Sequence, residues 1–193
     1  MSEVYLGLVH YPIYNRNMDV VAGSVTNFDI HDIARTCTTY DLKKYFIIHP
    51  ASSQHDIVEE ILKYWRHGYG ANANPDRNQA LSVVQLVDNI ASAVNCIKTE
   101  TSKMPYIMTT DARTYPNTIS YYHARKIIEK DDRPVLILFG TGWGIQDEVM
   151  QAFDYILEPI YGVGEYNHLC VRSAVAIILD RLLGVQWWCS NNK

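Results

Sequence analysis

The densest cluster of glycines, residues 139–144 with the sequence Phe-Gly-Thr-Gly-Trp-Gly, directly follows the apolar run at 135–139. Glycine allows a backbone to approach a ligand closely and to adopt positive φ, and ligands of parallel α/β sheets bind beyond the carboxyl ends of strands. The spacing G-x-G-x-G differs from the dinucleotide pattern G-x-G-x-x-G, and no phosphate-loop lysine follows. The segment is therefore either part of a ligand site or a tight turn between a strand and a helix.

A second candidate segment spans residues 157–173, where a predicted strand leads through a loop into a long apolar helix. The backbone N–H and C=O groups of such a loop, together with its apolar side chains, can enclose an adenine. Asn167, His168, Arg172 and Ser173 place a dense polar set at the start of the helix. The alternative is that Asn167 caps the helix and Arg172 is a solvated charge.

Charged residues cluster at the start of a predicted helix within residues 25–36. Asp29 and Asp32 lie where a helix favours negative charge. Arg35 follows Asp32 by three positions and His31 by four, so these side chains share a helix face. The cluster is either part of a site or an ordinary first-turn acid with a surface ion pair.

The fourth candidate segment, residues 108–113, leaves another predicted strand with the sequence Met-Thr-Thr-Asp-Ala-Arg. Small hydroxyl side chains suit a strand end that faces a ligand. A plain turn is the alternative interpretation.

Alternating strands and helices must position these segments. Short apolar runs predict strands at residues 4–10, 20–25, 45–48, 106–109, 135–139 and 155–157. Apolar residues three and four apart predict helices at 29–40, 53–68, 119–129, 146–153 and 171–183, with a helix, or a helix and a short strand, at 80–96. Residues 68–78, rich in Gly, Asn and Pro, predict a long loop. The pattern predicts an α/β fold whose mostly parallel sheet carries helices on both faces, in one domain, 1–193.

Composition and charge exclude several classes of protein. With 17 Lys and Arg against 21 Asp and Glu, the formal net charge is −4, so an RNA substrate would be held by a small basic patch, a dimer cleft or a helper protein. The 7 His and 4 Cys form neither HExxH nor CxxC, and we expect no metal site. No run is long enough for a membrane span and no signal peptide opens the chain, so we expect a cytoplasmic protein.

Taken together, the four segments resemble the motifs of the SPOUT class of S-adenosylmethionine-dependent RNA methyltransferases, in particular its small single-domain bacterial branch. Residues 159–184 resemble the third motif, which opens the final helix, and residues 135–145 resemble the second. Residues 29–36 resemble the first motif, in which a polar residue precedes an arginine by six positions; here these are Asp29 and Arg35.

Two positions depart from the pattern of that class. Asp29 stands where Asn is usual, although Asn27 is close by, and Thr141 stands where Glu is often found. The resemblance therefore leaves the catalytic step open. It also leaves open an alternative function, a catalytically inactive protein that binds the cofactor and RNA in a regulatory role.

The resemblance implies a deep trefoil knot in the C-terminal part, S-adenosylmethionine as cofactor, and a homodimer with the RNA site across its interface. It implies methylation of tRNA or rRNA, on a base or a ribose, without identifying the nucleotide or the atom. Arg35 would orient the substrate or help to deprotonate it, and Asp29 is the second candidate for a base. The implied cofactor-binding residues are Thr109, Thr110, Ala112, Phe139, Gly140, Thr141, Gly142, Gly144, Leu157, Pro159, Ile160, Gly162, Tyr166, Asn167, His168, Leu169 and Arg172.

Overall fold

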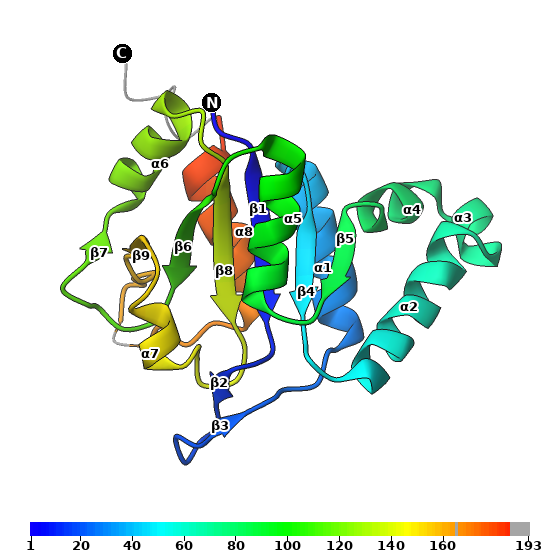
Figure 1. Ribbon diagram of the computed structural model, residues 1–193, viewed down its shortest axis with the longest axis horizontal. Coiled ribbons are helices and arrows are strands. Elements are labelled where there is room, and N and C mark those ends of the chain that lie inside the picture. The colour runs from blue at the N-terminus through cyan, green and yellow to red at the C-terminus, as the bar shows by residue number, and fades with distance from the viewer. Residues whose placement is uncertain (165, 186–193) are drawn as a thin grey trace.

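The computed structural model describes residues 1–164 and 166–185. In this part of the chain, a seven-stranded sheet has the order β5-β4-β1-β8-β6-β9-β7, and each neighbouring pair is parallel (Figure 1). The small antiparallel ribbon β2–β3 lies beyond the carboxyl ends of the central strands (Figure 1). The strands are β1 (Val4–Val9), β2 (Ile13–Tyr14), β3 (Val20–Val21), β4 (Tyr45–Ile48), β5 (Val84–Val87), β6 (Tyr106–Thr110), β7 (Thr118–Ile119), β8 (Val135–Gly140) and β9 (Tyr155–Leu157).

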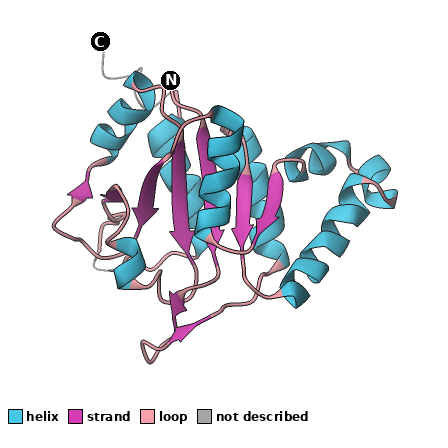
Figure 2. Cartoon of the chain, in the orientation of Figure 1, coloured by secondary structure: helices cyan, strands magenta, loops and turns pink. Residues whose placement is uncertain are grey.

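Helices cover both faces of the sheet, as the sequence predicted. Figure 2 shows the long helix α5 in front of the strands and α1 and α8 behind them. The segment α2 to α4 extends from the edge formed by β5 (Figure 1). The helices are α1 (Asn27–Thr39), α2 (Ser52–Arg66), α3 (Tyr69–Ala73), α4 (Pro75–Leu81), α5 (Ile90–Thr101), α6 (Tyr121–Lys130), α7 (Asp147–Met150) and α8 (Val171–Leu183).

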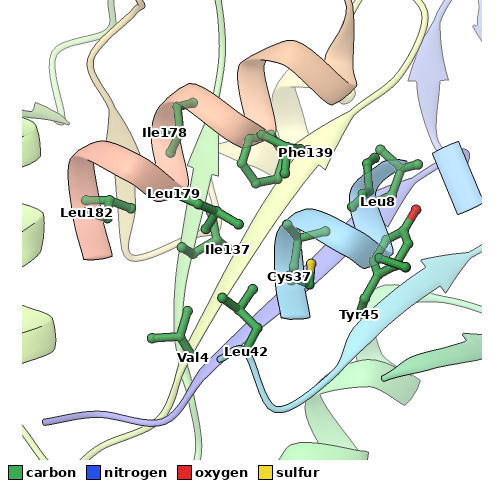
Figure 3. Close-up of a cluster of buried hydrophobic side chains, with 14 of the residues drawn as sticks. Val4, Leu8, Cys37, Leu42, Tyr45, Ile137, Phe139, Ile178, Leu179 and Leu182 are labelled. Carbon is green, nitrogen blue, oxygen red and sulfur yellow. The ribbon is translucent and has the colours of Figure 1, made fainter. Parts of the chain in front are cut away.

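Two apolar cores flank the sheet because its central strands are buried on both faces. Residues of β1 and β4 are all buried, as expected for strands between two helical layers. One core joins the sheet to α1, α6 and α8, and Figure 3 shows Phe139 and Ile137 of β8 beside Ile178, Leu179 and Leu182 of α8. The other core joins the opposite face to α5 and α7.

The stretch 68–78 is not the predicted loop, because α3 and most of α4 occupy it. Asn74 ends α3 and caps α4: its Oδ1 accepts a hydrogen bond from the backbone N–H of Arg77 at 3.0 Å. Pro75 at the start of α4 has no N–H to leave unpaired. The same residues that suggested a loop therefore serve as helix boundaries.

Three further stretches show how the structure corrects or refines the expectations from the sequence. The strand expected at 20–25 is only β3, outside the main sheet. The stretch 80–96 holds the end of α4, then β5 and the start of α5, so the alternative that included a strand was correct. The two-residue strand β7 was missed: Thr118 and Ile119 pair with Ile156 and Leu157 of β9.

Candidate functional site

All four candidate segments line one pocket, of about 910 Å³, at the carboxyl ends of the sheet strands. The residues after β6, β8 and β9 form one part of its wall, and the end of β1 with the start of α1 forms another. Of the residues predicted to bind a cofactor, those that line the pocket are Thr110, Ala112, Phe139, Gly140, Thr141, Gly142, Gly144, Ile160, Asn167, His168, Leu169 and Arg172.

Five of the predicted residues do not line this pocket: Thr109, Leu157, Pro159, Gly162 and Tyr166. Thr109 and Leu157 are fully buried in the sheet, where the hydroxyl of Thr109 donates to the Leu138 carbonyl at 3.4 Å. Successive strand residues point to opposite faces of the sheet. Thr110 can therefore line the pocket while its neighbour Thr109 does not. Tyr166 points to solvent and is 77% exposed.

The glycine turn after β8 needs its glycines for two physical reasons. Gly142 and Gly144 have φ of +58° and +99°, a region that other residues rarely adopt. A Cβ on Gly142 would also lie 2.8 Å from the Tyr14 carbonyl oxygen. That close approach is held by hydrogen bonds, from Trp143 N to Tyr14 O at 3.0 Å and from Tyr14 N to Gly144 O at 2.9 Å. The turn is therefore fixed in shape before any ligand arrives.

Thr141 fastens this turn to the neighbouring strand. Both its backbone N–H, at 3.2 Å, and its hydroxyl, at 3.0 Å, donate to the carbonyl oxygen of Val9 at the end of β1. Its side chain is thus engaged with the backbone at the position where the resemblance placed a Glu.

The segment between β9 and α8 is tied across the pocket to the segment after β6. Asn167 donates from Nδ2 to the Ala112 carbonyl oxygen at 2.8 Å, and the hydroxyls of Thr114 and Tyr161 are 3.3 Å apart. Asn167 is not the cap of α8: that position is Cys170, whose side chain makes no capping bond to the backbone. A hydrogen bond with Ser173 instead lowers the pKa of the Cys170 thiol.

An ion pair that the sequence analysis did not select stands on the pocket wall. Arg113 contacts both carboxylate oxygens of Asp111 at 3.1 Å and Asp147 Oδ1 at 3.4 Å. These contacts raise the pKa of Arg113, first through the hydrogen bonds to Asp111. Asp111 in turn lies against the turn, since a Cβ on Gly144 would be 3.3 Å from its Oδ2. The pair braces the glycine turn from the β6 side.

Asp29 lies in the pocket wall and is 7% exposed. Its Oδ2 accepts hydrogen bonds from the backbone N–H of Thr26 at 3.2 Å and from the Thr26 hydroxyl at 2.7 Å. The backbone N–H of Asp29 donates in return to Thr26 Oγ1 at 3.3 Å, which completes a capping box for α1. No described residue donates to the other oxygen, Oδ1. Asp29 therefore caps the helix and keeps one carboxylate oxygen for a ligand.

The two arginines of interest differ in position. Arg172 lines the pocket, with its guanidinium 5.1 Å from the ring centre of Phe28 and its Nε 3.6 Å from Asp32 Oδ2. Arg35 is exposed and does not line this pocket. The described chain therefore does not bring Arg35 and the cofactor-binding segments together by itself.

His10, at the end of β1, was missed by the sequence analysis, which treated it as the last residue of an apolar strand. It lines the pocket, is 1% exposed, and neither ring nitrogen has a hydrogen-bond partner among the described residues. Burial lowers the pKa of His10 to about 4; nearby Asp29 opposes this shift and His49 adds to it. The ring is therefore neutral at pH 7.

Two other kinds of feature, a metal-binding cluster and a membrane-spanning helix, are missing from the described residues. No group of three or more His, Cys, Asp or Glu side chains there is arranged to hold a metal ion. Among the helices of that same part of the chain, none is long and apolar enough to cross a membrane.

Comparisons with known proteins point to one chemistry. Residues 3–184 match a family model described as SAM-dependent RNA methyltransferase. An uncharacterized protein of Aquifex aeolicus (strain VF5) is 45% identical over 181 residues, which are 94% of this chain and 88% of that protein. The tRNA (guanine-N(1)-)-methyltransferase of Nitratidesulfovibrio vulgaris is 40% identical over 94% of this chain, but the chain spans only 42% of that longer protein.

The fold is also shared with solved structures. TrmJ from Z. mobilis ZM4 superposes with a TM-score of 0.60 and 15% sequence identity, covering 96% of this chain and 70% of that one. At this identity the similarity shows the fold alone.

Proposed function

Because the chain belongs to the S-adenosylmethionine-dependent RNA methyltransferases, whose family model matches residues 3–184, we propose that it methylates tRNA and that the pocket at the strand ends is its active site. The observation that carries this proposal is the convergence of all four motif segments on that pocket. S-adenosylmethionine, when bound, supplies an electrophilic methyl group. The remaining work, positioning the acceptor and excluding water, falls to the residues of the chain.

The pocket fits this cofactor in size and chemistry. Its volume of about 910 Å³ lies within the range of small-molecule sites, roughly 300–1,000 Å³. Gly140 and Gly144 both line the pocket, and the turn requires glycine at 140 because a Cβ there would lie 2.9 Å from Ile145 N. We assign the cofactor to the loops after β6, β8 and β9, with Ile160 and Leu169 as apolar walls.

The path of the C-terminal segment supports a trefoil knot. The loop after β9 lies against the loop after β6, where the Asn167–Ala112 bond and the Thr114–Tyr161 contact join the two. Helix α8 then packs against α1 and the back of the sheet. We propose that this segment is threaded as in the knotted SPOUT enzymes and that residues 1–193 act as one domain.

Arg35 is best explained by a homodimer. It is exposed and lies outside the pocket of its own chain, so we propose that it reaches the pocket of a partner subunit. There its guanidinium would orient the acceptor nucleotide or help to deprotonate it. Asp29, which already lies in the wall, is the second candidate for a base.

The choice of tRNA rests on the relatives. Two curated relatives named as tRNA methyltransferases are at least 40% identical to this chain over 94% of its length. The chain covers 42% of each, so the guanine-N1 activity in their names is not assigned to it. The net charge of −4 favours a local contact with RNA over a broad one. With tRNA as the proposed substrate, we propose a cytoplasmic location.

Transfer of radioactive label tests the proposal. The purified chain is incubated with methyl-tritiated S-adenosylmethionine and with bulk tRNA or rRNA taken from a strain that lacks the protein. We expect label in the tRNA fraction, and mass spectrometry of its nucleosides then identifies the modified base or ribose. Cofactor binding without label in either RNA would support the inactive, regulatory alternative instead. Label confined to rRNA would contradict the choice of tRNA.

A further inference from the structure

His10 is a buried polar side chain that the fold itself does not use. It is 1% exposed, and both Nδ1 and Nε2 lack hydrogen-bond partners among the described residues. Leaving a buried polar group unpaired costs free energy, because the group loses its bonds to water and gains none. Native structures rarely contain such groups without a reason, and a ligand that completes the bonds is one.

A neighbouring histidine shows the contrast. His49, at 3% exposure, follows β4 as His10 follows β1. Its Nδ1 accepts a hydrogen bond from Ala51 N at 2.9 Å, and its Nε2 then donates to the Gly23 carbonyl oxygen at 3.0 Å. His49 is thus a structural residue with both nitrogens satisfied, 6.0 Å from the His10 ring.

The surroundings of His10 differ from those of the cofactor loops. Gly23, Ser24, Phe28 and Asp29 line the pocket beside it, and all come from the N-terminal part of the chain. A Cβ on Gly23 would lie 3.8 Å from His10 Nδ1, so the Gly23 backbone packs close to the Nδ1 side of the ring. The part of the pocket near His10 is therefore built mainly by the N-terminal part of the chain, although Thr141 of the loop after β8 also lies beside Gly23, with its Oγ1 3.4 Å from a Cβ there.

Charge restricts what can bind beside His10. Asp29 is close enough to influence the ionisation of His10, and its Oδ1 is free to accept a hydrogen bond. A phosphate or carboxylate here would be repelled by Asp29 and would meet an uncharged ring. A neutral group fits better if it offers a carbonyl to the His10 N–H and an N–H to the Asp29 carboxylate.

We propose that His10, with Asp29 Oδ1, binds the base of the acceptor nucleotide by an edge on which a ring N–H adjoins a carbonyl, as in guanine or uracil. The inference rests on the proposed methyltransferase function and adds the base class and the residue that selects it. Phe28 and Trp143, which are 63% and 58% exposed, line the same pocket. Their exposed rings are suited to stack on neighbouring bases.

Kinetics of substituted enzymes test the role of His10. His10→Leu removes both hydrogen-bonding atoms, while His10→Gln keeps a donor and an acceptor. We expect His10→Leu to lower kcat/KM for tRNA about tenfold or more with unchanged affinity for S-adenosylhomocysteine, and His10→Gln to recover part of the loss. The matched control is His31→Gln, since His31 also has an unpaired nitrogen, Nδ1, but does not line the pocket.

Stability separates this role from a structural one. Because the side chain of His10 makes no hydrogen bond within the described fold, His10→Leu should leave Tm unchanged or raise it. A fall in Tm for both variants, a loss of S-adenosylhomocysteine affinity, or wild-type kcat/KM in His10→Leu would each overturn the assignment.

Mononucleotides test the base class without depending on catalysis. The full chain, saturated with S-adenosylhomocysteine, is labelled with ¹⁵N at histidine and titrated with each of the four ribonucleoside monophosphates. We expect guanosine and uridine monophosphate to shift the ring resonances of His10, while the adenosine and cytidine compounds do not. No shift with any of the four, or equal shifts with all, would defeat this inference. If shifts occur in a protein that transfers no methyl group, the proposed function fails and the site remains.

Discussion

Asn167 and Ala112, which are 55 positions apart in the sequence, are joined by a hydrogen bond of 2.8 Å from the side-chain amide to the backbone carbonyl. The bond connects the loop before α8 to the loop after β6, and both loops line the pocket. A single side chain therefore helps to hold together two walls of the proposed cofactor site.

Asn167→Ala should weaken cofactor binding more than folding. The variant loses one hydrogen bond worth about 1 kcal/mol, so we expect the Kd for S-adenosylhomocysteine to rise about fivefold. Calorimetric titration measures it. The matched control is Asn95→Ala, an exposed side chain on α5, on the other face of the sheet. Equal affinities of the two variants would contradict a bracing role for Asn167.

Gly142→Ala should destabilise the protein. An alanine there must keep φ at +58°, and its Cβ would lie 2.8 Å from the Tyr14 carbonyl oxygen. The left-handed backbone conformation alone costs about 1–2 kcal/mol. We expect a lower urea midpoint with an unchanged slope. Gly164→Ala is the control, because a Cβ at Gly164 has no atom within 4 Å. A Gly142→Ala midpoint at or above that of the control would show that the turn tolerates a side chain.

The sequence predicted the site segments better than the residues within them. The four segments were found because polar residues and glycines directly follow apolar runs. Which residues face the pocket depends on the alternation along each strand, so Thr109 and Thr110 could not be separated before the strand ends were known. His10 was missed because its distinguishing feature is that neither ring nitrogen has a hydrogen-bond partner among the described residues. Only the packed structure reveals this.

Elements marked by an apolar run were predicted closely, even short ones such as β9 (Tyr155–Leu157), and elements that depend on tertiary contacts were not. β4 matches its predicted range, since Pro50 bounds a run of four apolar residues. Strand β7 has two residues and exists through its pairing with β9, which no local pattern encodes. Helix α4 begins in a Gly- and Asn-rich stretch, and its packing against α1 and α2 stabilises it.

Stability should depend on pH through His10. Its pKa falls from 6.5 to about 4 on folding, so between these values the unfolded chain binds a proton that the folded chain does not. The free energy of unfolding therefore decreases as the pH falls through this window. His31 and His49, whose pKa values burial also lowers, act in the same direction.

His10→Leu isolates that contribution. Between pH 7 and pH 4.5 we expect the variant to lose about 2 kcal/mol less of its unfolding free energy than the wild type. Urea unfolding at the two pH values measures the difference. Identical losses in the two proteins would mean that His10 is already accessible to protons in the folded state.

Mixed dimers should reveal whether Arg35 acts across the interface. A subunit with Arg35→Ala keeps an intact pocket but lacks the arginine. A subunit with Gly144→Val should have a blocked pocket but supplies an intact Arg35. Each variant alone should be inactive. If Arg35 serves the partner's pocket, co-expressed subunits should recover about a quarter of wild-type activity, because half of the random dimers hold one complete site. Inactive mixtures of well-folded heterodimers would place Arg35 in its own subunit's site or outside catalysis.

The central claim is that the loops after β6, β8 and β9 form a site for S-adenosylmethionine, and a calorimetric titration of the full chain with S-adenosylhomocysteine tests it most directly. The account predicts saturable binding of one molecule per chain, which Gly144→Val abolishes and Gly164→Ala leaves unchanged. Absence of binding to the wild-type chain, or equal binding to Gly144→Val, would contradict it.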